Sequence, residues 1–443
     1  MSTIIKKLKI YFILTLCMTV SFVGLKMLAY CVPDEPVKKN IVSSVEYMQK
    51  EGIYPSAYAD DEYNLYSQRL DNCTDVIFLN VIYNMRKTNC LEAVLCDYRG
   101  ISGGDTELDK LYDVVNSEDY SLASYGRQWF GSISFLRILL SVFTLPQIRI
   151  LSQYFMYILL GLSVLLISKK ADYKIAVLFL LNMSVISLDV VAASVNHAGA
   201  FYSLLLGVIM VCLLHNKVSD YVIIYIVGGI TAYFDLFSLP FVTPLVAIFV
   251  LYMDYKEEEI YDFKSGFLRM MYLAVFWIAG YVVLWMAKWF LASIAGRRNV
   301  FADALIEMGK QSVNKSTIDW GPETTSGYIV ESIQLCLENM FPINYFKMAY
   351  QNGGKTLVWG FVIILLLLLI LLAVRYHKKM GQIWFSWLMI IIASFPYLCY
   401  VVMHTHAFIH FWMWFRMQLI TWMAIGLAYL EALDFKKQKS NTG

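Results

Sequence analysis

Charged residues are scarce in this chain, and none of them forms a long basic block. Asp, Glu, Lys and Arg make up 16% of the 443 residues, and the formal net charge is +2. A chain without a basic stripe lacks the electrostatic footprint of nucleic-acid-binding proteins, so we exclude that class. Apolar residues make up 59% and the mean hydropathy is +0.57, against roughly 45–50% apolar residues in soluble domains. The composition therefore predicts a polytopic membrane protein.

Motifs for metal binding and for signal-peptide cleavage are also missing. The eight cysteines include no Cys-x-x-Cys pair, and no His-Glu-x-x-His sequence occurs, so no resident metal is predicted. Cys73, Cys90 and Cys96 share one polar loop, where one disulfide among them is an option of unspecified connectivity. No Ala-x-Ala site follows the first apolar run, so we interpret residues 10–30 as an uncleaved span.

Ten apolar segments are candidates for crossing a bilayer, which takes about 20 residues. They lie near residues 10–30, 149–168, 174–192, 199–214, 220–235, 239–253, 269–292, 356–374, 382–402 and 413–431. We predict an all-α polytopic membrane protein with about ten transmembrane helices and two large extracytoplasmic loops. The segment 132–145 is too short to cross and contains Arg137, which favours an interfacial helix.

The placement of Lys and Arg predicts the orientation. These residues gather in short connections that alternate with the spans, which places both termini and those connections in the cytoplasm. The chain then divides into five parts: a first helix (1–30), an extracytoplasmic loop with interfacial helices (31–148), helices two to seven (149–292), a second extracytoplasmic loop (293–355), and the last three helices with a cytoplasmic tail (356–443). Nearly all unusual polar residues fall outside the cytoplasm, so we predict the active site on the outer face of the plasma membrane.

The acidic pair Asp34-Glu35 follows the first span and stands between Pro33 and Pro36, which restrict the backbone. A general base must be held within about 3 Å of the proton that it removes, and attachment to a transmembrane helix supplies that fixation. We predict both carboxylates to be catalytic. They could instead orient an acceptor or hold a divalent cation, and the alternative without function is a solvated pair at a helix end.

Two further segments of the first loop carry candidates for substrate binding. Arg127 lies beside Trp129 in a glycine-flanked segment, where its fork could grip a phosphate and the indole could sit at the headgroup level. The alternative is an interfacial anchor without a ligand. Asp71 and Asp75 are four residues apart, so on a helix they would repel and need a cation. A capping role for Asp71 or Thr74 is the alternative, and a substrate contact is predicted for Asp75.

The later outer turns hold a second group of candidates, namely His197, Asp235, His404, His406, His410 and Arg416. An acid or an arginine at membrane depth is costly unless it has a partner. We therefore predict that Asp235 either contacts the substrate or pairs with an arginine, and that Arg416 contacts a lipid phosphate. We expect the histidines to bind a sugar or phosphate rather than a metal, although His197 could be a plain turn residue.

A first span that ends in Asp34-Glu35, a large outer loop with interfacial helices and many further spans resemble the GT-C superfamily of membrane glycosyltransferases. The segments Asp71–Asp75 and Tyr125–Gly131 are also similar to segments of bacterial members. Those relatives have Tyr-Gly-Arg-Tyr-Trp-His-Gly where this chain has Gln128 and Phe130, so no polar role is carried over to Phe130. The resemblance implies a polyprenyl-phosphate sugar donor and an active-site acid at Asp34 or Glu35.

These observations predict an integral membrane glycosyltransferase of inverting type. It would transfer a sugar from a polyprenyl-phosphate donor to an extracytoplasmic acceptor, a cell-surface glycopolymer, with no cofactor other than an optional divalent cation. One alternative is a transporter or flippase for lipid-linked sugars or polysaccharide, which the absence of evident inverted repeats disfavours. The other is a non-catalytic subunit of a surface-polymer assembly machine.

Overall fold

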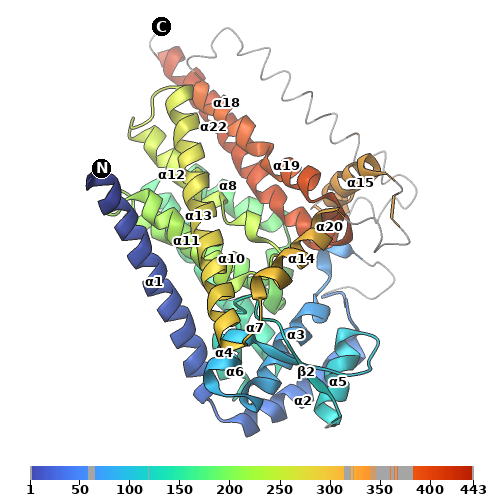
Figure 1. Cartoon of the computed structure of the whole chain (residues 1–443). Coiled ribbons are helices and arrows are strands. Elements are labelled where there is room, and N and C mark those ends of the chain that lie inside the picture. The colour runs from blue at the N-terminus through green and yellow to red at the C-terminus, as the bar shows by residue number, and fades with distance from the viewer. Residues whose placement is uncertain are drawn as a thin grey trace.

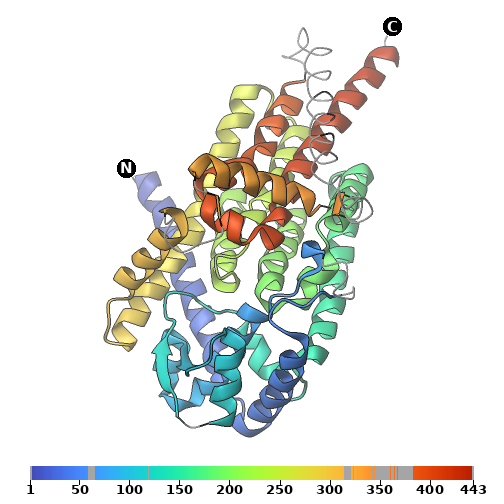
Figure 2. The ribbon, with the colours of Figure 1, turned by 90° about the vertical axis from the view of Figure 1, so that its right-hand side faces the viewer.

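Long helices and a separate layer of short elements make up the molecule (Figure 1). The computed structural model describes residues 2–57, 65–117, 119–313, 321–322, 324–340, 343–344 and 383–441, with single residues at 360, 364 and 367. The short elements of the first loop gather at one end of the long helices, and both chain termini lie away from that end (Figures 1 and 2). The first loop therefore forms a layer of its own on the helical bundle.

Five helical stretches are long and apolar enough to cross a membrane. They lie in α1 (Ser2–Cys31), α7 (Leu145–Lys170), α10 (Val195–Leu214), α13 (Phe263–Ala295) and the consecutive helices α18 (Trp384–Ala393) and α19 (Phe395–Val402). The other described elements after α7 are α8 (Tyr173–Val185), α9 (Leu188–Ala193), α11 (Asp220–Phe234), η3 (Pro240–Val242), α12 (Leu245–Lys256), α14 (Val300–Val313), α15 (Thr325–Glu338), α20 (His404–Ile409), α21 (Phe411–Trp414), η6 (Phe415–Met417) and α22 (Gln418–Asn441).

The prediction of a mostly helical, membrane-associated chain is confirmed, whereas the number of ten spans is not. The predicted spans 220–235 and 239–253 correspond to helices of 15 and 12 residues, α11 and α12. At a rise of about 1.5 Å per residue, such helices are shorter than the hydrocarbon core of a bilayer. The predicted span 356–374 lies outside the described ranges, apart from three single residues.

The first loop consists of α2 (Asp34–Glu51), η1 (Tyr66–Gln68), α3 (Asn72–Asn84), η2 (Met85–Lys87), α4 (Cys90–Cys96), β1 (Tyr98–Ile101), α5 (Glu107–Asn116), β2 (Ser121–Ser124) and α6 (Ile133–Leu140). The prediction that this loop contains helices is confirmed, and α2 and α3 are the longest of them. Residues 98–101 form β1, which pairs antiparallel with β2. The Asn80 side chain holds both backbone groups of Gly100, a contact that local composition does not reveal.

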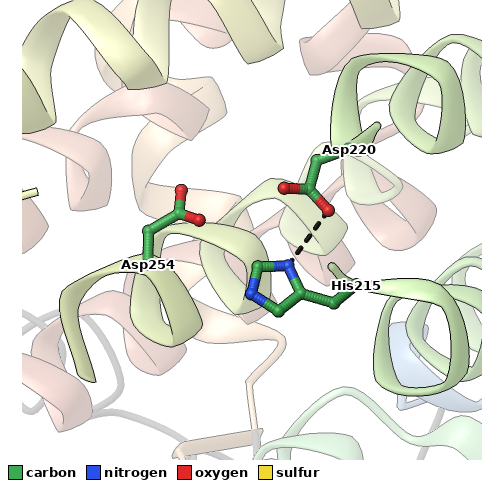
Figure 3. Close-up of side chains that lie close together, drawn as sticks. All are labelled: His215, Asp220 and Asp254. Carbon is green, nitrogen blue, oxygen red and sulfur yellow. Dashed lines mark hydrogen bonds and ion pairs between the residues drawn. The ribbon is translucent and has the colours of Figure 1, made fainter. Parts of the chain in front are cut away.

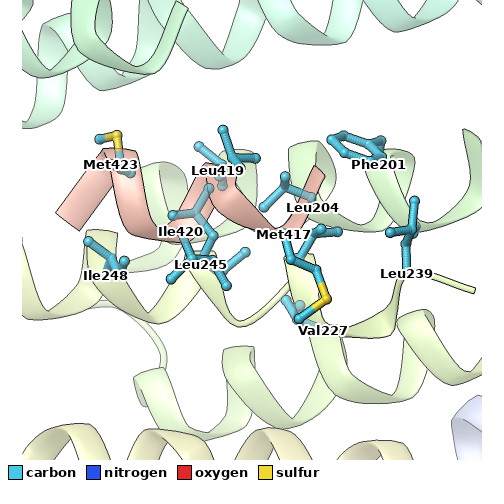
Figure 4. Close-up of a cluster of buried hydrophobic side chains, with 14 of the residues drawn as sticks. Phe201, Leu204, Val227, Leu239, Leu245, Ile248, Met417, Leu419, Ile420 and Met423 are labelled. Carbon is cyan, nitrogen blue, oxygen red and sulfur yellow. The ribbon is translucent and has the colours of Figure 1, made fainter. Parts of the chain in front are cut away.

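A continuous apolar core joins the C-terminal helix to the middle of the chain. Figure 4 shows Leu204 of α10 next to Leu419 of α22, and Ile248 of α12 next to Met423 of α22. All of these side chains are buried. This packing holds the connections between the helices in place, including the polar segments that follow α11 and α19.

Helices α11 and α13 approach so closely that their backbones touch through glycines. A Cβ atom on Gly228 would lie 2.2 Å from the carbonyl oxygen of Trp277, and one on Gly280 would lie 2.1 Å from that of Tyr225. Small residues that allow such contact are typical of helix pairs in membranes. The crossing fixes the position of the turn after α11.

A buried charge triad attaches the first loop to two long helices. Asp97, at the end of α4, forms ion pairs with Lys26 of α1 and Lys288 of α13, the second at 2.7 Å. All three side chains are fully buried. Lys26 also donates to the carbonyl oxygen of Trp129, at 2.9 Å. We call this group the lysine–aspartate triad; it fixes the loop against the spans.

Candidate functional site

A buried polar cluster lies where the N-terminus of α3 meets the N-terminus of α10. Asp71 accepts a hydrogen bond from the backbone N–H of Thr74 at 3.0 Å, which confirms the capping alternative. Its other oxygen accepts from the Asn196 side chain at 2.8 Å. Asp75 accepts from the backbone N–H groups of Val195 and Asn196, at 3.2 and 3.0 Å. The first turn of α10 therefore binds a carboxylate, as helix N-termini favour.

Arg149 of α7 is the cation that the two acids require. Its guanidinium lies 3.5 Å from the Asp75 carboxylate, pairs with Glu51 at 3.0 Å and donates to Asn72. Burial raises the pKa of Asp75 to about 6, which the Arg149 charge only partly offsets. The predicted partner cation exists, although the sequence did not identify it as Arg149.

An apolar cavity of about 520 Å³ borders this polar cluster. It lies among α6, α7, α9 and α10, and Arg149 and Val195 belong to both the cavity wall and the cluster. Exposed Phe135, Leu151 and Phe155 are also part of its lining, so the cavity opens to the side of the helices. Its volume falls within the usual range for ligand sites, roughly 300–1,000 Å³.

Residues near the C-terminal end of the chain complete the cluster. The ring of buried His197 lies 5.4 Å from that of Trp412, and its Nε2 is 3.9 Å from an oxygen of Asp71. Arg416 is fully buried and donates to the carbonyl oxygens of Trp412 and Ser67. Within the part of the chain that the structure describes, no carboxylate lies within 4.0 Å of Arg416. A buried guanidinium in that state can accept an anionic ligand.

The turn after α11 adjoins the same cluster. Asp235 is fully buried, and one of its oxygens accepts from the backbone N–H of Leu239 at 2.9 Å. Ser238 donates to the Asn196 side chain at 2.9 Å. The alternative that Asp235 pairs with an arginine is wrong for the described residues, since none approaches it. The predicted residues Asp75, His197, Asp235, His406, His410 and Arg416 thus converge in one region.

Asp34 and Glu35 lie elsewhere. The Asp34 carboxylate is 2.8 Å from Arg137 and 2.7 Å from Lys38. Partial burial raises its pKa, but hydrogen bonds from Lys38 and Arg137 outweigh burial and hold the pKa below its ordinary value. Glu35 is exposed. Arg137 of α6 is fully buried within the protein and also donates to the carbonyl oxygen of Ala29.

Arg127 and Trp129 lie in a third region, next to α13 and α14. Arg127 faces two acids of α14, Asp303 at 3.4 Å and Glu307 at 3.7 Å. Trp129 is fully buried, and its indole N–H donates to the carbonyl oxygen of Leu284 at 2.8 Å. The indole therefore contacts protein rather than lipid or solvent. His404 is only partly buried and lies near Tyr328, 6.1 Å between ring centres.

One further group could offer ligands to a metal ion. His215, Asp220 and Asp254 carry ligand atoms within 4.8 Å of one another (Figure 3). Arg269 of α13 already lies 2.6 Å from Asp220 and 2.7 Å from Asp254. Because this guanidinium forms ion pairs with both carboxylates, we interpret the group as an ion-pair network that joins the ends of four helices.

Arg149, Asn196, Lys26 and Lys288 were not among the predicted functional residues. Lys26 and Lys288 stand inside long apolar runs, and Arg149 opens one. A charge in an apolar run is a strong signal for a buried partner, so these three could have been found. Asn196 carries no such signal.

Comparison with protein-family models, curated proteins and solved structures gave no match. The functional argument therefore depends on the geometry of the site.

Proposed function

We propose that this chain is an integral membrane glycosyltransferase that uses a polyprenyl-phosphate sugar donor. The observation that supports this proposal is the contact between a laterally open apolar cavity and a buried polar cluster, shared through Arg149 and Val195. The cavity suits a prenyl chain. Arg416 offers positive charge to a lipid phosphate, and the neighbouring acids offer a base. The acceptor is a glycopolymer hydroxyl outside the cytoplasm.

The reaction is a direct displacement at the anomeric carbon. A carboxylate removes the proton of the acceptor hydroxyl, the oxygen attacks the anomeric carbon, and the bond to the phosphate oxygen breaks with inversion. The lipid phosphate leaves with both bonding electrons, and Arg416 stabilises its charge. Asp75 suits the base because its pKa of about 6 lies near neutral pH. Asp34 and Glu35 are the competing candidates from the sequence.

Comparison of the candidate acids tests the proposal. The full chain is reconstituted in lipid nanodiscs with synthetic polyprenyl-phosphate sugars, and product is measured by mass spectrometry. We expect Asp75→Asn to reduce transfer by at least about 100-fold, the contribution of a general base, and exposed Glu35→Gln to retain it. Loss in Asp34→Asn but not in Asp75→Asn would move the base to Asp34. A wild type that carries sugar lipid across vesicle bilayers without transfer would favour a flippase.

The phosphate position has its own test. Arg416→Ala is expected to weaken the binding of prenyl phosphate, whereas Arg127→Ala is expected to retain it, because Asp303 and Glu307 already neutralise Arg127. Arg416→Lys should also bind poorly, since the fork geometry is lost. The reverse order of the two alanine variants would place the phosphate at the Tyr125–Gly131 segment.

A further inference from the structure

Four buried polar atoms beside the turn after α11 have no hydrogen-bond partner in the described part of the chain. They are Oδ2 of Asp235, the hydroxyl of Tyr281, Nε2 of His406 and Nε1 of Trp414. All four side chains are more than nine-tenths buried. Roughly 90% or more of buried polar groups in proteins are hydrogen-bonded, so a concentration of exceptions indicates a place where a ligand supplies the partners.

The four groups share one neighbourhood. Tyr281 lies within electrostatic reach of Asp235, and its ring is 5.1 Å from that of Trp285. Trp285 stacks on Phe237, two residues after Asp235, with ring centres 5.6 Å apart. The ring of His406 is 6.2 Å from that of Phe237 and 5.1 Å from that of Trp414. Residues from α13, α20 and α21 therefore surround the turn that carries Asp235.

The backbone of this turn is held in an unusual conformation. Phe237 has φ of 70°, a region that bulky side chains rarely occupy. One oxygen of Asp235 accepts a hydrogen bond from the backbone N–H of Leu239, and the Ser238 hydroxyl donates to the Asn196 side chain. These two hydrogen bonds hold the backbone on both sides of Phe237 in place. Residues kept in such conformations concentrate at ligand sites. The second Asp235 oxygen is left oriented and unpaired.

The aromatic rings alone do not define a site. Trp277, Tyr281, Trp285 and Trp289 follow one another at every fourth position of α13, which is also the pattern of ordinary core packing. The three indole N–H groups are satisfied by Thr243, Gln128 and the Arg127 carbonyl oxygen. Tyr281 differs from them, because its hydroxyl is the polar group of this row that lacks a described partner.

The hydrogen-bond donors and acceptors among these four groups indicate the chemical class of the ligand. A carboxylate oxygen accepts from hydroxyl groups and would repel a phosphate. The indole, the phenol and the imidazole can donate to hydroxyl oxygens, and the aromatic faces can cover the apolar face of a ring. A prenyl chain could not satisfy these polar atoms. A ring that carries several hydroxyl groups satisfies both kinds of contact.

We propose that Asp235, Tyr281, His406 and Trp414 form the subsite that binds the sugar ring of the lipid-linked donor. This inference rests on the proposed function. Ser238 and Asn196 connect the subsite to Asp71, so the sugar would lie beside the polar cluster at the end of the apolar cavity. The chain, the phosphate and the sugar would then occupy successive parts of one continuous site.

The test separates the sugar from the lipid. Wild-type protein in nanodiscs is titrated with short-chain prenyl phosphate alone, and with the same lipid carrying glucose, galactose or N-acetylglucosamine. Asp235→Asn retains an oxygen that can accept from Leu239, and Tyr281→Phe removes one hydroxyl. We expect each variant to bind the preferred sugar lipid about tenfold more weakly, the loss of roughly one buried hydrogen bond, while binding of prenyl phosphate is unchanged.

Tyr225→Phe is the matched control. Its hydroxyl, also in a long-helix contact, already bonds Thr15, so its removal should leave sugar binding unchanged. Equal binding of the preferred sugar lipid by wild type and both variants would overturn the subsite, as would a wild type to which no sugar adds affinity. Sugar-dependent binding that the variants lose, without any transfer to an acceptor, would instead overturn the proposed enzyme and retain the subsite.

Discussion

Arg137 depends on Asp34 for its charge partner. The guanidinium is fully buried and also donates to three backbone carbonyl oxygens, those of Ala29, Val32 and Ile82. We expect Asp34→Ala to lower the free energy of unfolding by about 1–3 kcal/mol, because it leaves a buried charge without its counter-ion. Asp34 is only partly buried, so we expect this loss of stability to be smaller than the loss on breaking a fully buried ion pair. Thermal unfolding in detergent measures the change.

The control for this prediction is the double variant Asp34→Ala with Arg137→Met. Because the uncompensated charge is then absent, the double variant should lose less stability than the two single variants together. Strict additivity would show that the two side chains are not coupled.

At the same scale, the sequence predicted several side chains of the site but not their partners. Asp235 and Arg416 were identified because polar residues at membrane depth are costly, and His197 was identified from its place in an outer turn. Their convergence depends on contacts such as Arg416 with Ser67, 349 residues apart in the chain. Asp34 was predicted to be catalytic for its position at a helix end, and nothing local indicated that Arg137, 103 residues later, would bind it.

The crossing of α11 and α13 is the element-scale contact most sensitive to substitution. Gly280→Leu would place side-chain atoms on the backbone of Tyr225, so we expect the helices to separate and the protein to lose about 1–3 kcal/mol of stability or more. The yield of monodisperse protein on size exclusion should fall accordingly. Gly24→Leu is the control, because nothing lies within 4 Å of a Cβ atom at Gly24. Equal losses in both variants would contradict the prediction.

The ion-pair network at the ends of four helices should make stability depend on pH. The hydrogen bond with Asp220 raises the pKa of His215, and Asp254, Glu257 and Arg269 also face this cluster. A raised pKa means that the protonated form stabilises the fold below about pH 6.5, the ordinary value for histidine. This contribution is lost as the pH rises through the raised pKa.

Melting temperatures of wild type and His215→Gln between pH 5 and pH 9 measure this effect. The wild type should lose stability relative to the variant as the pH rises through that window. A constant difference between the two proteins would show that His215 does not titrate differently on folding.

The sequence predicted elements better than their lengths. The prediction that the first loop contains helices is confirmed by α2, whose Val37, Ile41, Val45 and Met48 side chains are buried. In contrast, α11 and α12 are too short to cross a bilayer alone, and apolar composition does not distinguish a short buried helix from a span. The ribbon of β1 and β2 was missed because its pairing depends on residues 20 or more positions apart.

For the whole molecule, the Lys and Arg bias predicts that both termini face the cytoplasm and that the first loop lies outside. A cysteine at Asp105 in a background of cysteine-to-serine variants should react with a membrane-impermeant maleimide in intact cells. A cysteine at Lys437 should react only after lysis. Labelling in the opposite order would overturn the orientation and, with it, the location of the proposed reaction.

The three residues of the lysine–aspartate triad are synthesised at widely separated times. Lys26 enters the membrane with the first helix, and Asp97 follows 71 residues later. Lys288 lies another 191 residues along the chain, so roughly 10–40 s separate its synthesis from that of Asp97 at about 5–20 residues per second. During this interval only Lys26 is available to pair with Asp97, and the triad can be completed only after α13 has been made.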